Sequence, residues 1–303
     1  MLYGGVTGRR ILIDVVKTGD DRRLSVEVTG DPGGSPVFLL HGTPGSRLGP
    51  RPRSLLLHRL GVRLISFDRP GYGGSDRLPG RRVADAAADV AAIADAFGLD
   101  QYAVVGRSGG GPHALACAAL LPERVSRAAV LVSLAPREAD GLDWFDGMTD
   151  SNVDAYAGPA GRLDRVIARL METADSVRDD PASLLARLYA EMTDDDRRVV
   201  ADAGIRLGLM RAYAEALRES PYGWIDDVKA FRTEWGFDPA AVSVPVLLWH
   251  GERDMFSPVS HSRWLGTRIP DAMVVVKSDA AHFDALSVLP DVLQWLVTDP
   301  SLE

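Results

Sequence analysis

The sequence is poor in cysteine, in long hydrophobic runs and in clustered basic residues. A single cysteine, Cys117, cannot form a disulfide within the chain, and its Ala-rich apolar surroundings predict a buried side chain. No stretch reaches the roughly 18 apolar residues that a membrane-spanning helix needs. The opening residues, MLYGGVTGRR, lack the basic start and apolar run of a secretory signal. We therefore expect a cytoplasmic protein that does not enter a membrane.

Positive charge is also scarce. The chain has 34 lysines and arginines against 42 aspartates and glutamates, a net charge of -8. Binding to nucleic acid needs clustered positive charge. The basic pairs that occur, Arg51 with Arg53 and Arg81 with Arg82, are short and are expected on a solvated surface. These features favour a small-molecule substrate over nucleic acid. Because no Cys/His cluster has metal-ligand spacing, we expect neither a metal nor another cofactor.

The order of hydrophobic segments predicts an α/β fold. Helical periodicity over residues 83–97, a helix after residue 108 and a last helix from about residue 290 separate several of the apolar segments. Short, continuously apolar strands alternating with helices are typical of a doubly wound, mostly parallel sheet that is covered on both faces. The expected strands are residues 11–16, 24–28, 36–40, 62–67, 102–105, 128–132, 244–249 and 273–276.

The alternation of strands and helices stops between about Pro136 and Ala240. This stretch has amphipathic helical patterns and no strong strand signal. We therefore predict an α/β core formed by residues 1–136 and 241–303, with residues 137–240 inserted as a helical cap. In a parallel sheet, connections that leave the carboxyl ends of strands lie beside the functional site. The cap is accordingly expected to cover that site.

A motif for nucleophilic chemistry lies at Gly106-Arg107-Ser108-Gly109-Gly110. It follows an expected strand and precedes an expected helix, which is the context that a G-x-S-x-G nucleophile turn requires. The chain must turn sharply at the serine, and side chains at the flanking glycines would collide there. Gly-Ser-Gly runs also occur as plain turns. We interpret Ser108 as a nucleophile.

A serine nucleophile needs a base, and a carboxylate to orient that base. Among the six histidines, His282 is the expected base, because it lies in a loop after the last strand. The other histidines are expected either in structural roles, as for His41, His113 and His250, or on the surface, as for His58 and His261. Asp254 follows the strand at residues 244–249 and is the expected carboxylate. It could instead only cap a helix. Glu252, Asp279 and Asp284 are weaker candidates.

The negative charge that develops during acyl transfer needs backbone N–H donors. Gly109, directly after the nucleophile, is the first expected donor. The second should come from the loop His41-Gly42-Thr43-Pro44-Gly45. We predict Thr43 for this role, because Pro44 has no N–H to donate.

Taken together, these segments resemble the α/β-hydrolase family. The resemblance covers nearly the whole chain and is weak only in the cap. It implies acyl transfer without a cofactor, and a serine nucleophile argues against the family's dehalogenases and epoxide hydrolases. Gly109 stands where proline iminopeptidases usually have Trp, and Arg107 where many members have His. The matching motifs are residues 41–45, Asp68-Arg69-Pro70-Gly71-Tyr72-Gly73-Gly74-Ser75, residues 106–110, Gly251-Glu252-Arg253-Asp254 and His282.

The resemblance implies a serine hydrolase, most simply a carboxylic ester hydrolase acting on a small or medium-sized hydrophobic ester or related acyl compound. Thioesters, lactones, C–C bonds and perhydrolysis remain open, as does a non-hydrolytic role in ligand binding, cyclisation or rearrangement. Large apolar residues of the cap could line the substrate pocket, although most such residues form cores. The candidates for the pocket are Trp144, Phe145, Met148, Met210, Tyr213 and Trp224.

Overall fold

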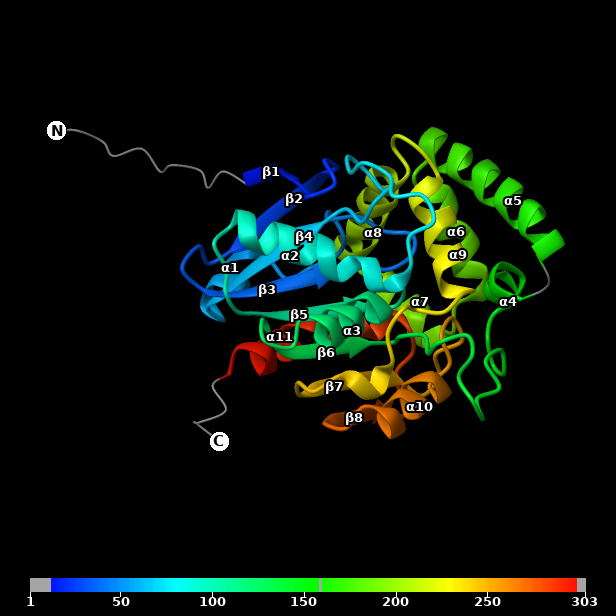
Figure 1. Ribbon diagram of the computed structural model, residues 1–303. Coiled ribbons are helices and arrows are strands. Elements are labelled where there is room, and N and C mark those ends of the chain that lie inside the picture. The colour runs from blue at the N-terminus through cyan, green and yellow to red at the C-terminus, as the bar shows by residue number, and fades with distance from the viewer. Residues whose placement is uncertain (1–11, 158–159, 299–303) are drawn as a thin grey trace.

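The computed structural model describes residues 12–157 and 160–298, and at its centre lies an eight-stranded sheet (Figure 1). The strand order is β1-β2-β4-β3-β5-β6-β7-β8. β2 pairs antiparallel with β1 and β4, and the other neighbouring strands are parallel. The strands are β1 (Leu12–Lys17), β2 (Arg23–Gly30), β3 (Ser35–Leu40), β4 (Val62–Phe67), β5 (Tyr102–Arg107), β6 (Val125–Leu131), β7 (Val246–Gly251) and β8 (Ala272–Lys277).

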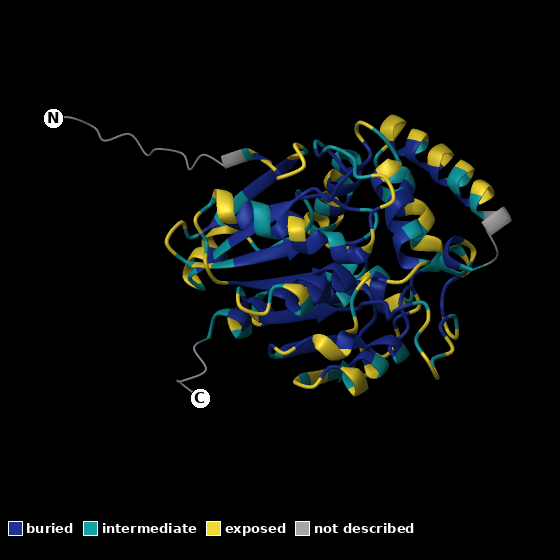
Figure 2. Ribbon diagram, in the orientation of Figure 1, coloured by how far each residue is buried: buried dark blue, intermediate teal, exposed yellow. Residues whose placement is uncertain are grey.

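The central strands are apolar on both faces, because each face packs on helices. In β3, Phe38 and Leu40 belong to one core, whereas Val37 and Leu39 belong to the core on the other face. Figure 2 shows the middle of the sheet as buried. This two-sided burial is the reason that these strands have continuous rather than alternating hydrophobicity.

Helices cover both faces of the sheet. The first core includes side chains of α2, α3 and α10, and the second includes side chains of α1 and α11. The predicted doubly wound, mostly parallel sheet is confirmed. The covering helices are α1 (Ser54–Arg59), α2 (Ala86–Ala96), α3 (Gly110–Leu120), α10 (Ser260–Arg268) and α11 (Leu289–Val297).

Between β6 and β7 the described chain forms helices and connecting segments, with no strand. In Figure 1 these helices gather at the end of the sheet toward which the arrows of β3, β5 and β6 point. The predicted helical insertion is confirmed, while its limits at residues 137 and 240 stay a prediction. The inserted helices are α4 (Asp150–Tyr156), α5 (Ala160–Asp179), α6 (Ala182–Glu191), α7 (Asp194–Val200), α8 (Ala203–Ala216) and α9 (Tyr222–Phe231).

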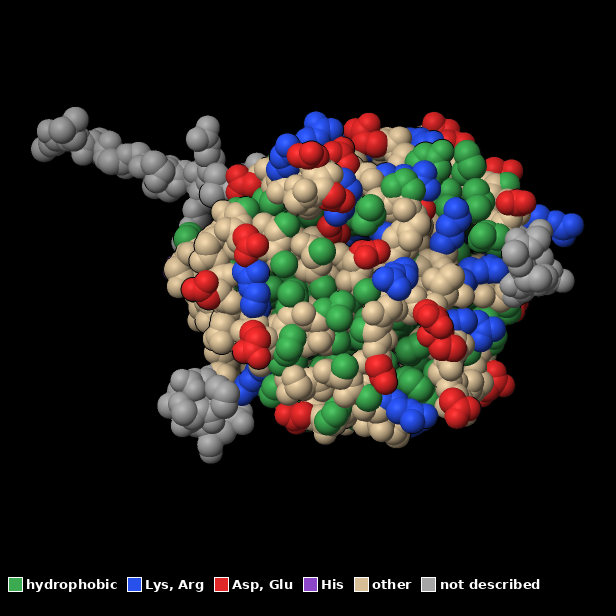
Figure 3. Space-filling model, in the orientation of Figure 1, with side chains coloured by type: hydrophobic (Ala, Val, Ile, Leu, Met, Phe, Trp, Pro, Cys, Tyr) green, Lys and Arg blue, Asp and Glu red, His purple; other side chains and the backbone are tan. Residues whose placement is uncertain are grey.

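The fold also bears on the sequence expectations about membranes and surface charge. In residues 12–157 and 160–298, no helix combines the length and the hydrophobicity needed to cross a bilayer. On the face shown in Figure 3, acidic and basic side chains are interspersed, so that neither sign dominates that face.

Candidate active site

Ser108 lies on a tight turn between β5 and α3. Its backbone has a φ of +55°, a left-handed conformation that is strained for a residue with a side chain. The turn is held because the Ser108 amide donates to the Leu131 carbonyl at 2.8 Å. A β-carbon on Gly106 would lie only 2.2 Å from the carbonyl oxygen of Gly110. The glycines therefore permit the close approach of strand and helix that the motif predicts.

His282 and Asp254 form a buried hydrogen-bonded pair. The Nδ1 atom of His282 lies 2.8 Å from Oδ2 of Asp254. Because a carboxylate only accepts, Nδ1–H is the donor, and in the neutral ring Nε2 is left to accept a proton. The other oxygen of Asp254 accepts hydrogen bonds from the backbone N–H groups of Phe256 and Ser257, at 2.8 and 3.0 Å. Asp254 thus both contacts the histidine and stabilises the turn that follows it, but it does not cap the next helix, since α10 begins at Ser260 with Val259 as its N-cap.

Asp254 is ionised in this setting. Burial alone would raise the pKa of its carboxyl, but the charge of His282 and hydrogen bonds from His250 and His282 outweigh burial and hold the pKa well below its usual range. The weaker candidates lie elsewhere, since Glu252 pairs with Arg263 and Asp284 accepts from the amide of Ala281. A fixed negative charge behind His282 would stabilise the protonated ring during catalysis.

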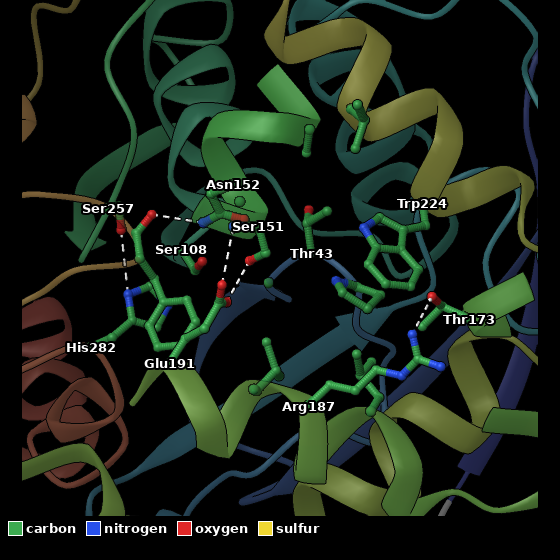
Figure 4. A pocket seen from close by; sticks show the side chains of 18 of the residues that line it. Thr43, Ser108, Ser151, Asn152, Thr173, Arg187, Glu191, Trp224, Ser257 and His282 are labelled. Carbon is green, nitrogen blue, oxygen red and sulfur yellow. Dashed lines mark hydrogen bonds between the residues drawn. The ribbon is translucent and has the colours of Figure 1, made fainter. Parts of the chain in front are cut away.

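Ser108 and His282 open onto one cavity of about 480 Å³. Its wall combines loops at the carboxyl end of the sheet with side chains of the inserted helices α4, α5, α6, α8 and α9. Figure 4 shows Ser108 and His282 on one side of this cavity, with Trp224 and Arg187 on the other. The insertion therefore roofs the cavity into which the serine opens.

Thr43 and Gly109, the expected oxyanion donors, lie side by side in the wall of the cavity. A β-carbon on Gly109 would lie 2.2 Å from Oγ1 of Thr43, and both residues line the cavity. Among the described residues, neither backbone N–H has a hydrogen-bond acceptor. Two free donors beside Ser108 are what an oxyanion hole requires. That these amides bind an oxyanion stays a prediction.

A buried ion cluster joins the loop at Thr43 to helix α9. Asp227 on α9 accepts hydrogen bonds from Arg69 and Arg81, both at 2.6 Å, from Tyr72 at 2.7 Å and from the Thr43 hydroxyl at 2.5 Å. Burial would raise the pKa of Asp227, but the two guanidinium charges hold it well below its usual range. The expectation that Arg81 lies on a solvated surface is wrong, because it is fully enclosed with this carboxylate.

Removing the charge of Asp227 is expected to be costly. Asp227→Asn leaves Arg69 and Arg81 buried with no carboxylate between them, which should lower the free energy of unfolding by about 3–5 kcal/mol. Asp226→Asn is the matched control, because its partner Arg77 keeps 32% of its side chain exposed and can turn to water. Urea unfolding of both variants measures the difference. An equal or smaller loss in Asp227→Asn would contradict this role for the cluster.

His261, expected on the surface, is fully buried instead. Its Nδ1 accepts the amide N–H of Ala135 at 2.9 Å, and its Nε2–H donates to the Trp144 carbonyl at 3.0 Å. Burial lowers the pKa of His261 to about 4, so that the ring stays neutral. The available signal was its position four residues before the buried Leu265 on the same helix. His58 is exposed, as expected.

Two of the six candidate pocket residues, Tyr213 and Trp224, line the cavity, and the other four lie outside its wall. Trp144 is buried, donates from Nε1 to the Ala135 carbonyl at 2.9 Å and packs its ring against Phe145. Met148 belongs to the core shared by the sheet and the insertion, and Met210 packs against the core of the insertion. Apolar periodicity identifies the face of a helix that is buried but does not distinguish a core from a cavity.

Several polar residues of the wall have no distinguishing sequence signal. Glu191 accepts hydrogen bonds from both the amide and the hydroxyl of Ser151, at 3.1 and 2.5 Å (Figure 4). Arg187 reaches Oγ1 of Thr173 at 3.3 Å. In an amphipathic helix such residues look like an ordinary solvated face. Only the packing of α4 and α5 against α6 brings them to the cavity.

Comparisons with known proteins agree with this architecture. A family model described as "alpha/beta hydrolase fold" matches residues 35–287. A pimeloyl-[acyl-carrier protein] methyl ester esterase of Chromobacterium violaceum is 31% identical, with 90% of this chain and 96% of the relative covered. A 2-hydroxymuconate semialdehyde hydrolase of Pseudomonas putida is 27% identical, with 82% of this chain and 81% of the relative covered.

The fold also matches solved structures. The crystal structure of an esterase from Rhodococcus sp. superposes with a TM-score of 0.64 at 22% identity, covering 94% of this chain and 98% of that one. The strand order, the serine turn and the helical insertion agree with the family match over most of the chain. This chain belongs to the α/β hydrolase fold family.

Proposed function

We propose that this protein is a serine hydrolase that cleaves small or medium-sized hydrophobic esters, or related acyl compounds, through an acyl-enzyme. The observation that carries the proposal is the buried His282–Asp254 pair, whose histidine lines the same cavity as Ser108 on its strained turn. A serine, a base held in one tautomer and a charged carboxylate behind it are the parts of a catalytic triad. The pimeloyl ester esterase relative supports the choice of an ester.

The proposed reaction has two halves. His282 Nε2 takes the proton of the Ser108 hydroxyl as its oxygen attacks the carbonyl carbon, and the amides of Thr43 and Gly109 bind the resulting oxyanion. The tetrahedral intermediate then expels the alkoxide, which receives the proton from His282. Water, deprotonated by His282, attacks the acyl-enzyme, and the second tetrahedral intermediate releases the carboxylic acid as the Ser108 oxygen takes its proton back from His282. Asp254 stabilises the charged imidazolium in both halves.

The cavity supports a limit on substrate size. Its volume of about 480 Å³ lies in the range typical of small-molecule sites. Much of its wall is apolar, including Leu170, Leu184, Trp224 and Val228 from the insertion. These helices also shield the acyl-enzyme from bulk water. A substrate with a compact hydrophobic part fits this wall better than an extended polymer does.

A panel of nitrophenyl esters and matched thioesters tests the proposal. We expect kcat/KM to peak at short or medium acyl chains, such as butanoyl or hexanoyl, and to fall for hexadecanoyl esters and polyesters. Trp224→Ala enlarges the cavity and should shift the optimum toward longer chains. Trp264→Ala, which removes a partly buried Trp outside the wall, is the control and should leave the optimum unchanged. Equal rates on polymeric and small esters, or no activity on any ester, would count against the proposal.

A further inference from the structure

Arg107 lies beside the expected nucleophile and borders two cavities. It directly precedes Ser108 at the end of β5, and it lines both the main cavity and an adjoining smaller chamber of about 30 Å³. Gly42, Pro44 and Tyr213 also line both spaces and form the wall between them with Arg107. A β-carbon on Gly42 would lie 3.5 Å from Nη2 of Arg107, which places the guanidinium beside the expected oxyanion loop.

The guanidinium of Arg107 lacks an anionic partner. Three of the buried arginines contact a carboxylate, since Arg47 contacts Asp68, and Arg69 and Arg81 share Asp227. A fourth, Arg127, donates to the Trp295 carbonyl. The guanidinium of Arg107 makes neither a hydrogen bond nor an ion pair with any residue in the described part of the chain, and its nitrogens are accessible rather than fully enclosed. Leaving guanidinium donors unmet in the interior is energetically unfavourable, and removing the charge by deprotonation is not open to arginine.

The surroundings of Arg107 strengthen this point. Its side chain is deep enough for burial to lower its pKa, although part of its surface remains accessible. Burial and partial accessibility of the Arg107 side chain are compatible if its accessible part faces the two cavities rather than bulk solvent. Among the described residues, the one aspartate whose charge is found to act on it, Asp254, is already bound to His282. The cation therefore has free donors only toward the cavities.

The smaller chamber is suited to an anionic group. No aspartate or glutamate is among the described residues of its wall, whose polar members are His41, Ser46, Ser66 and Arg107 with Tyr213. Its volume of about 30 Å³ is small beside the 480 Å³ of the main cavity, so it admits water or a small polar group rather than a second ring. Burial raises the pKa of Tyr213 to about 12, so its phenol stays protonated as a possible donor.

We propose that Arg107 binds a carboxylate carried by the substrate, so that the preferred esters bear an anionic carboxylate in addition to the bond that is cleaved. The planar fork of the guanidinium matches a carboxylate with two parallel hydrogen bonds. The ester group would lie at Ser108, and the carboxylate would contact the guanidinium of Arg107, which lines the same cavity as Ser108. This inference rests on the proposed hydrolase function and names the class of its substrates.

An activity comparison tests the assignment. Monomethyl glutarate carries the carboxylate on the acyl side, and acetoxyacetate carries it on the alcohol side. The neutral control for each is the corresponding primary amide of the same shape. Wild-type enzyme is expected to favour the anionic member of at least one pair by about 10- to 100-fold in kcat/KM. The pair that shows the preference identifies which side of the ester bears the carboxylate.

Variants then assign the preference to one residue. Arg107→Met should bring the anionic-to-neutral ratio close to one, whereas Arg107→Lys, which keeps the charge but loses the fork, should lower the ratio only in part. Arg187→Met tests the exposed arginine at the rim. A ratio of one in the wild type overturns the proposal. So does an equal loss on anionic and neutral esters in Arg107→Met, or loss of the preference in Arg187→Met alone.

A binding measurement separates this inference from the hydrolase proposal. Isothermal titration calorimetry of Ser108→Ala needs no turnover, and the anionic member of at least one of the two ester pairs is expected to bind at least about tenfold more tightly than its neutral primary amide. The difference should vanish in the double variant with Arg107→Met and should persist in part with Arg107→Lys, which also serves if the Met variant does not fold. If an anionic ester binds in this way but no ester is cleaved, only the hydrolase proposal fails. If esters are cleaved but neither anionic ester is bound in preference to its neutral amide, only the Arg107 assignment fails.

Discussion

Ser108→Ala is expected to lower kcat on the best ester by about 10⁶-fold. The substitution removes only the hydroxyl oxygen, which is the attacking atom of the proposed reaction. The turn keeps its backbone conformation, because alanine meets the same strain as serine at a φ of +55° and the flanking glycines are unchanged. Stability should therefore remain close to that of the wild type, and the loss should lie in the chemical step rather than in folding.

Steady-state kinetics with a melting curve of the same sample checks this expectation. Ser151→Ala is the matched control, because Ser151 also lines the cavity but bonds to Glu191 rather than standing on the turn. Its loss should be smaller by several orders of magnitude. Near wild-type turnover in Ser108→Ala would remove the basis for the assigned nucleophile and for the whole reaction scheme.

Asp254→Asn is expected to lower kcat by about 10⁴-fold, as the corresponding change does in trypsin-like enzymes. An amide that donates toward Nδ1 of His282 would favour the tautomer with its proton on Nε2, which cannot accept the proton of Ser108. The buried position makes the loss of charge more damaging, because no water replaces the carboxylate. The remaining amide oxygen can still accept from Phe256 and Ser257, so the turn should persist.

Glu252→Gln is the control for Asp254→Asn. Glu252 lies two residues earlier, keeps 40% of its side chain exposed and pairs with Arg263 rather than with the triad. Its substitution should change kcat little. A silent Asp254→Asn together with a severe effect of Glu252→Gln or Asp279→Asn would show that another carboxylate orients the base.

Local sequence patterns were sufficient for the sheet and the serine turn. The strands have continuous apolar runs because both faces are covered, and the glycines around Ser108 are required by contacts within a few residues. Even so, β7 begins at Val246, after Pro245, rather than at the expected Val244. A proline has no N–H to pair with a neighbouring strand, which displaces the start of the ladder.

Contacts between distant segments account for what the sequence did not predict. Arg81 was expected in solvent because its partner Asp227 lies 146 residues further along the chain. His261 contacts the amide of Ala135 across a separation of 126 residues. Neither contact is visible in the hydrophobic periodicity of the sequence, because a buried charged residue and a solvated one can have the same local sequence. The same limit applies to Trp144, whose hydrophobicity fits a core as well as a cavity.

Labelling with a fluorophosphonate, followed by intact mass and peptide mapping, tests the central claim most directly. The reagent phosphonylates a serine whose hydroxyl is activated by a base and releases fluoride. A single adduct on Ser108 of the wild-type protein is expected, with none on Ser108→Ala and a much slower reaction on Asp254→Asn. Ester hydrolysis by wild-type protein that carries no adduct, or an adduct on a different residue, would contradict the assignment of Ser108, His282 and Asp254 as a catalytic triad.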